Sequence, residues 1–167
     1  MKHKLGKAVL LLAVSDFNRA RSFYETVLDL EIEMNDEVSH IIYKNGISLQ
    51  RDYKGIVEGT PTFTTAPTGA KIDVGVRSNN HQMYFDVDDI EHWYAKIKAA
   101  GVEFVHGVHE YIWGQRVFRI YDPDGHIIEF GEDLKVVAKR FLSQGKSLQE
   151  VADMFGESLK FIQELVG

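Results

Sequence analysis

The sequence predicts an α+β fold of two β-α-β-β-β modules followed by a helical C-terminal extension. The main observation is an internal repeat, because the same order of strand and helix patterns occurs twice. Val14 and Val87 each close the first strand of a copy, 73 residues apart. A second observation is a C-terminal stretch in which apolar residues recur at helical spacing. We therefore expect a paired βαβββ domain in residues 1–133 and the extension in residues 134–167.

The first module is expected in residues 7–53. It starts with a continuous apolar run, Val9–Val14, which predicts a strand buried on both faces. Asp16 is suited to cap the next helix, since apolar residues recur at helical spacing from Phe17 to Leu28. An Asn-Gly turn precedes the last strand, which is a strong hairpin signal. The three remaining strands are expected at Glu31–Met34, Ser39–Lys44 and Ile47–Arg51.

The second module is expected in residues 81–133, after a linker at residues 54–80. The linker has little periodicity, and a connection of this length inside a compact domain is usually functional or mobile. Asp88 or Asp89 is suited to cap a helix that begins near Ile90. The expected strands are His81–Val87, Val102–Val108, Trp113–Tyr121 and His126–Phe130.

The cleft between the two modules is the predicted ligand site, because side chains alternate along strands and one parity faces away from each helix. Gly46 and Gly125 open the last strand of each module and align Gln50 with Glu129. Glu129 lies within an apolar strand, and a buried charge needs a partner, a proton or a metal. The expected lining is Gln50, Gln82 and Glu129, with walls from Tyr43, Tyr84, Trp113, Arg119 and Tyr121. His106 and His109 are three apart, so plain alternation predicts that they face opposite ways.

Composition excludes several classes of function. The chain has 167 residues, a hydrophobic fraction of 44% and a net charge of −6, which argues against a surface that coats nucleic acid. It has no cysteine, so disulfides and thiolate zinc sites are excluded. The short N-terminal apolar run does not fit a signal peptide, and no window reaches membrane-spanning length. We expect a cytoplasmic protein.

Three motifs in this order resemble the glyoxalase / bleomycin-resistance / extradiol-dioxygenase superfamily, also called the vicinal oxygen chelate fold. They lie at Val14–Leu30, Tyr84–Phe104 and Trp113–Glu132, and the resemblance covers roughly residues 7–133. The order Trp-Gly-x-Arg-x-Phe, Asp-Pro-Asp-Gly and Phe-Gly-Glu is more similar to the bleomycin-resistance branch than to metal-dependent glyoxalase I. The resemblance implies a small organic ligand and a homodimer.

The resemblance also implies four possible metal-ligand positions, which carry Val9, Gln50, Gln82 and Glu129 here. Valine cannot bind a metal, and amide oxygens are weak ligands for Zn²⁺ or Fe²⁺. A bulge that turned His81 into the cleft would improve the set. The preferred hypothesis is therefore binding without a metal. The first alternative is a glyoxalase-like lyase, isomerase or dioxygenase with Zn, Ni or Fe, in which Glu129 is a ligand or general base.

The C-terminal extension supports a second alternative, a regulator that senses a ligand. Helices are expected at Leu148–Phe155 and Leu159–Val166, with Ser147 and Ser158 as N-caps, and together they resemble a helix-turn-helix. The second helix carries a single lysine, Lys160, where a helix that binds phosphates needs several basic residues. Binding to DNA is therefore disfavoured, and packing or dimer-stabilising helices are preferred.

Overall fold

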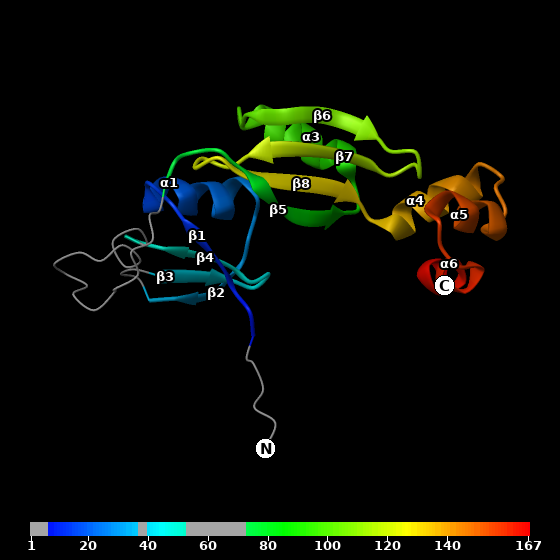
Figure 1. The fold of residues 1–167 in the computed structure, drawn as a ribbon, viewed down its shortest axis with the longest axis horizontal. Coiled ribbons are helices and arrows are strands. Elements are labelled where there is room, and N and C mark those ends of the chain that lie inside the picture. The colour runs from blue at the N-terminus through cyan, green and yellow to red at the C-terminus, as the bar shows by residue number, and fades with distance from the viewer. Residues whose placement is uncertain (1–6, 37–39, 53–72) are drawn as a thin grey trace, which may run out of the picture. The chain divides into compact units, whose positions relative to one another are not determined.

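The computed structural model describes residues 7–36, 40–52 and 73–167 (Figure 1). The chain forms two compact units: Met1–Ser78 with Asp122–Gly125, and Asn79–Tyr121 with His126–Gly167. Each unit has its own four-stranded sheet, and three further helices follow the second sheet. This architecture confirms the predicted fold class. Among the described residues, no helix is long and apolar enough to cross a lipid bilayer.

The first sheet has the strand order β1-β4-β3-β2. Its elements are β1 (Leu10–Ala13), α1 (Phe17–Ser22), the π-helical turn η1 (Phe23–Val27), β2 (Ile32–Asn35), β3 (His40–Tyr43) and β4 (Ile47–Gln50). β1 pairs in parallel with β4, and the other pairs are antiparallel. β1 is an edge strand on which Leu10 is 43% exposed, so the prediction of burial on both faces is wrong. An apolar run shows that a strand can be buried but does not give its place in the sheet.

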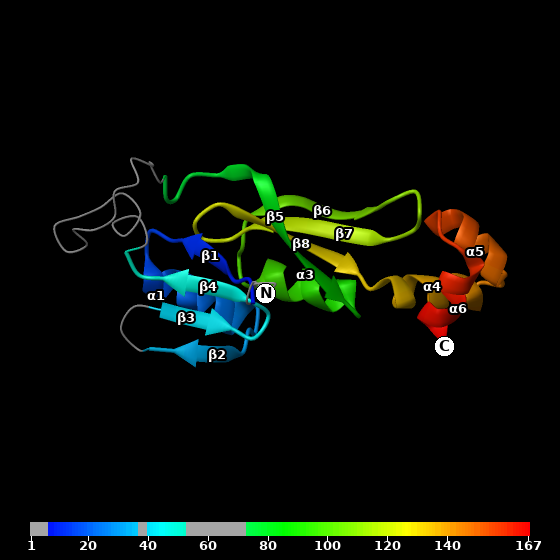
Figure 2. The same cartoon turned by 60° about the horizontal axis from the view of Figure 1, so that its bottom comes forward.

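The helix of the first unit lies against one face of this sheet (Figure 2). Asp16 caps α1 as predicted, since its side chain accepts a hydrogen bond from the backbone of Arg19 at 3.0 Å. Tyr24 in η1 is fully buried and donates to Asp122 Oδ2 at 2.7 Å. Asp124 accepts hydrogen bonds from the backbone N–H and the hydroxyl of Ser15 at 2.8 and 2.5 Å. The Asp-Pro-Asp-Gly turn therefore belongs to the core of the first unit.

The second sheet has the strand order β5-β8-β7-β6, and α3 covers one of its faces (Figure 1). Asp89 caps α3 through the backbone N–H of His92 at 2.9 Å. On the covered face, Phe118 stacks on Phe130 with ring centroids 4.7 Å apart, and Trp93 of α3 packs on Phe130. The elements are β5 (Ser78–Val87), α3 (Ile90–Ala99), β6 (Phe104–Glu110), β7 (Arg116–Tyr121) and β8 (His126–Glu132).

Two strands, β5 and β7, begin three residues away from the predicted position, which are the largest shifts among the strand starts. β5 begins at Ser78 rather than His81, within the expected linker, of which residues 54–72 lie outside the described chain. β7 begins at Arg116, so Trp113 lies in the turn before it and not in the strand. In that turn Gly114 has a φ of +83°, which favours glycine, and its N–H donates to the carbonyl of Tyr111 at 2.8 Å.

The C-terminal extension consists of α4 (Leu134–Ser143), α5 (Leu148–Phe155) and α6 (Leu159–Val166). The bounds of α5 and α6 agree with the prediction, and Ser147 and Ser158 are their N-caps. The three helices gather together after β8 (Figure 2). They share a small core of Val137, Ala138, Phe141, Val151, Ala152 and Ile162.

Candidate functional site

The face of the second sheet that points away from α3, called here the open face, brings most of the predicted site residues together. β7 and β8 pair so that Arg119 lies opposite Glu129 and Tyr121 opposite Ile127. Paired residues point to the same face, and Phe118 and Phe130, one position along, point to α3. Alternation along β5 places Gln82 and Tyr84 on the open face, whereas buried Met83 faces α3.

Arg119 is the centre of the polar groups on the open face. Its Nε donates to Gln82 Oε1 at 3.0 Å, and its Nη1 lies 2.8 Å from His106 Nε2. Its Nη2 donates to the hydroxyl of Tyr111 at 3.0 Å and forms an ion pair with Glu129 Oε2. Side chains from β5, β6, β8 and the turn before β7 therefore hold one guanidinium in a fixed orientation. The Arg119 side chain remains 23% exposed, so a ligand can still reach it.

The electrostatic environment keeps Arg119 charged. Burial by itself would lower the pKa of its guanidinium, but the hydrogen bond with Tyr111 and the charge of Glu129 outweigh burial and raise that pKa above its usual value. Glu129 is only 5% exposed, and Arg119 supplies the partner that a buried carboxylate requires. The pair is close to neutral overall, and it presents a rigid donor–acceptor surface rather than a free charge.

A second group of side chains connects the open face to the turn before β7. Gln115 donates from its amide to the hydroxyl of Tyr84 at 2.9 Å and to the carbonyl of Glu132 at 2.7 Å. Its amide oxygen accepts a hydrogen bond from the indole N–H of Trp113 at 3.1 Å. Trp113 stacks on Tyr111 with centroids 4.4 Å apart. Burial and the neighbouring Asp86 raise the pKa of Tyr84 to about 12, so its hydroxyl keeps its proton at neutral pH.

Tyr121 lies at the end of the open face and donates to Asn79 Oδ1 at 3.0 Å. This hydrogen bond ties β7 to the start of β5, a contact that sequence reasoning did not find because β5 was expected to begin later. The ring is partly exposed, so Tyr121 remains available as a wall of a ligand site.

The prediction that His106 and His109 face opposite ways is wrong. His106 pairs with Arg119 and His109 pairs with Val117, so three positions of β6 match two positions of β7. This irregularity in the strand turns both imidazoles to the open face, where His109 also packs edge-on against Tyr111 with centroids 5.4 Å apart. Gly107 within the strand was the available signal, since a glycine inside a strand often marks a bulge.

The first unit places Gln50 on the face of its sheet that points away from α1, as predicted. Gln50 pairs with His40 across β3 and β4, and both are partly exposed. On the same face His40 Nε2 lies 2.5 Å from the hydroxyl of Ser48, which also donates to the carbonyl of Ile41 at 2.9 Å. Sequence reasoning missed His40 and Ser48, although their parity is that of Gln50.

The prediction that Tyr43 forms a wall of a cleft is wrong. Tyr43 is fully buried, and its ring packs against Tyr24 of η1 with centroids 6.0 Å apart. It has the parity of Ile41, which is also buried, and not that of Gln50. Burial and the charge of Glu25 raise the pKa of the Tyr43 phenol. Tyr43 is therefore a core residue of the first unit.

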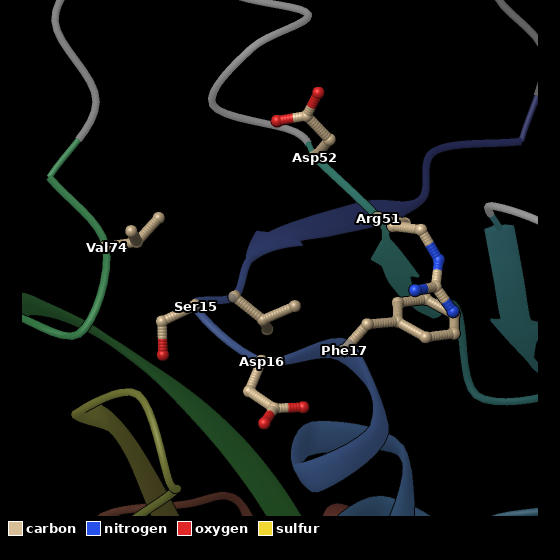
Figure 3. A pocket seen from close by; sticks show the side chains of 7 residues that line it. Ser15, Asp16, Phe17, Arg51, Asp52 and Val74 are labelled. Atoms are coloured by element: carbon tan, nitrogen blue, oxygen red, sulfur yellow. The ribbon is translucent and has the colours of Figure 1, made fainter.

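The first unit also contains a cavity of about 500 Å³ that was not predicted (Figure 3). It lies where β1 and β4 end and α1 begins, and the guanidinium of Arg51 covers the ring of Phe17 at 4.7 Å. Its polar lining carries both signs of charge, which gives no preference for an anion or a cation. Its labelled lining residues are Ser15, Asp16, Phe17, Arg51, Asp52 and Val74.

Comparison with known proteins identifies the family. A family model described as a glyoxalase-like domain matches residues 7–135. The chain belongs to the glyoxalase-like domain family. This confirms the resemblance to the glyoxalase / bleomycin-resistance / dioxygenase superfamily. A sequence comparison with curated proteins found no significant match.

Solved structures agree with this membership. A protein of unknown function from Agrobacterium tumefaciens str. C58 is 30% identical with a TM-score of 0.63, and the match covers 79% of this chain and 97% of that one. Lactoylglutathione lyase from Agrobacterium tumefaciens is 20% identical with a TM-score of 0.56, covering 78% and 96%. The fosfomycin resistance protein FosX from Listeria monocytogenes is 20% identical with a TM-score of 0.53, covering 78% and 95%. At this identity, the last two show the fold alone.

The residues at the family's metal positions do not fit a divalent metal. Gln82 Oε1 accepts a hydrogen bond from Arg119, and Glu129 forms an ion pair with the same guanidinium. Val9 has no donor atom. His81 does not improve the set, because its ring lies against His126 with centroids 5.8 Å apart. Within the described part of the chain, no three His, Asp or Glu side chains are placed to hold a metal ion.

Proposed function

We propose that the protein binds a small organic molecule on the open face of the second sheet, without a metal. Arg119 and Glu129 would orient polar groups of the ligand, and aromatic side chains would supply contact area. The observation that carries this proposal is the guanidinium of Arg119, which four side chains hold in place while it remains partly exposed. Such preorganisation reduces the entropy lost when a ligand is ordered.

The polar groups around Arg119 favour a ligand that has both an aromatic ring and hydrogen-bonding groups. Tyr84 is 45% exposed and offers a ring next to Glu129, while Trp113 and Tyr111 form a stacked pair nearby. Binding of this kind needs no nucleophile. The bleomycin-resistance branch that the motifs resemble supports an antibiotic-sequestering or related binding role. We also propose a homodimer, as that resemblance implies, which a molar-mass measurement in solution would test.

The binding proposal can be tested by NMR with three probes: benzoate, 1-naphthoate and quinoline-2-carboxylate. We expect at least one probe to shift the indole signal of Trp113. Arg119→Gln should weaken that probe at least about tenfold, since a hydrogen bond to a charged group contributes about 1.5–3 kcal/mol. Arg21→Gln, which removes an arginine paired with Glu25 in the first unit, is the matched control and should leave binding unchanged. The proposal is refuted when no probe shifts the signal or when both variants behave alike.

Elemental analysis of protein purified without chelator separates this proposal from metal-dependent catalysis. We expect transition metal well below one equivalent of protein. The oxygens of Gln82 and Glu129 that could bind a metal already contact the guanidinium of Arg119. Stoichiometric Zn, Ni or Fe that is lost in a Glu129→Ala variant would overturn the metal-free proposal. It would instead support a lyase, isomerase or dioxygenase.

A further inference from the structure

The second unit contains a cavity of about 160 Å³ between the turn before β7 and the C-terminal extension. The turn contributes Trp113 and Gln115, and the extension contributes Leu134, Phe155 and Glu157. The family match ends at residue 135, so Phe155 and Glu157 lie in a part of the chain that the family model does not cover. The cavity is therefore a product of this chain's own extension.

The walls of this cavity are mostly apolar and held in place. Trp113 is fixed by its hydrogen bond to Gln115 and by its stack on Tyr111. Phe155 packs against the core of the extension. Gln115 already uses its amide group for Tyr84 and the carbonyl of Glu132, and its amide oxygen for Trp113. The Gln115 side chain is thus fully engaged before any ligand arrives.

Glu157 is the charged group of the cavity lining. Its backbone N–H bonds the carbonyl of Ala152 at 3.0 Å, which fixes the position of the residue after α5. Its carboxylate forms no ion pair or hydrogen bond with another described residue. Arg140, which also contacts the turn, directs its guanidinium to Glu132 and to the carbonyl of Gly114, at 3.0 and 2.6 Å. The cavity lining therefore combines a negative charge with aromatic rings.

We propose that this cavity binds a small organic cation, an alkylammonium or quaternary ammonium group. An aromatic face attracts such a cation through its quadrupole, and a nearby carboxylate adds a charge of opposite sign. A water molecule takes about 30 Å³ in the liquid, so the cavity has room for about five water-sized groups, the size of such a head group. The site shares Trp113 with the proposed ligand site but uses neither Arg119 nor Glu129.

The probe is choline, and its matched control is 3,3-dimethylbutan-1-ol, which has the same shape without the charge. Each is titrated into the full chain while the indole N–H signals of the two tryptophans are followed by NMR. A Trp93→Phe variant assigns the signal of Trp113. We expect choline to shift the Trp113 signal and to bind about two- to fivefold more tightly than the neutral alcohol. Equal binding of the two compounds, or no shift at Trp113, would overturn the proposal.

Two charge-matched variants test the role of Glu157. Glu157→Gln should reduce the preference for choline over the alcohol, because only the aromatic rings then favour the cation. Glu164→Gln makes the same charge change on the exposed surface of α6, where Glu164 pairs with Lys160. This variant should keep the preference for choline over the alcohol. A preference that is unchanged in Glu157→Gln would refute the proposal.

Discussion

Replacing Glu132 by glutamine should destabilise the second unit, because this carboxylate is 1% exposed and forms ion pairs with two arginines. Its Oε1 accepts from Nη2 of Arg116 at 2.5 Å. Its Oε2 accepts from the backbone N–H of Arg116 and from Nη2 of Arg140, both at 3.0 Å. Glutamine keeps the shape of the side chain but places an amide NH₂ group where a guanidinium needs an acceptor.

The magnitude follows from burial. Removing one partner of a buried ion pair costs about 3–5 kcal/mol. The side chains of Arg116 and Arg140 are 28% and 26% exposed, so water can solvate part of each guanidinium in the variant. We therefore expect a loss of about 2–3 kcal/mol in the free energy of unfolding. In a chain of this length that loss corresponds to a decrease in Tm of about 5–10 °C.

Urea unfolding at pH 7, followed by circular dichroism, measures the effect. Glu110→Gln is the matched control, since Glu110 lies 3.9 Å from the same Arg140 but is 51% exposed. The control should change stability by less than about 0.5 kcal/mol. If Glu132→Gln falls within that same range, the reasoning about a buried charge at this position is wrong.

The pH dependence gives an independent check. Burial by itself would raise the pKa of Glu132, but hydrogen bonds from Arg116 outweigh burial and lower it below the usual 4.5. The carboxylate is then ionised in the folded state at a pH where the unfolded chain already binds a proton. Its stabilisation is complete above the unfolded pKa and is lost as the pH falls through the lower, folded value. The stability gap between wild type and Glu132→Gln should stay constant above about pH 5 and narrow below it.

Three further substitutions test other parts of the fold. Gly114→Ala should cost at least about 2 kcal/mol in urea unfolding, because its Cβ would lie 2.1 Å from Cζ of Phe141 at a φ of +83°, and adding Phe141→Leu should recover part of the loss. Tyr24→Phe should lower the stability of the first unit by about 1–3 kcal/mol, since buried Asp122 loses a donor, and an unchanged melting curve would contradict this. Ser147→Ala removes the N-cap of α5 and should cost about 1 kcal/mol, seen as faster amide exchange in α5 than in α3.

Local signals in the sequence were sufficient for most of the fold. An N-cap bond spans three residues, so Asp16, Ser147 and Ser158 could be identified from the sequence, and each caps its helix in the structure. For α3 the sequence left Asp88 and Asp89 as alternatives, and Asp89 is the cap. The order of strands and helices could also be predicted, because each element has its own local pattern and the same patterns occur in both copies of the repeat. Strand register and edge position depend on partners far away in the chain. This is why the exposure of β1 and the true start of β7 were missed.

In the candidate site, too, features set by local sequence could be predicted, whereas features set by distant strands could not. Alternation along single strands placed Gln82, Arg119 and Glu129 on one face, and the structure agrees. It failed for His106, because an irregular pairing adds a residue to β6, and for Tyr43, whose parity was assigned without a known partner strand. Which side chains Arg119 contacts depends on rotamers and could not be predicted. Ligand binding by these residues stays a prediction.

The contacts of α4 with the turn before β7 have a practical consequence for experiments on the C-terminal extension. Arg140 and Phe141 both touch Gly114, so a chain shortened to residue 133 would lose the supports of that turn along with the helices. A truncated protein that no longer bound a ligand or DNA would then report a displaced Trp113 as readily as a missing helix. Substitutions on the outer surface of α6 are the informative way to ask what the last helices do.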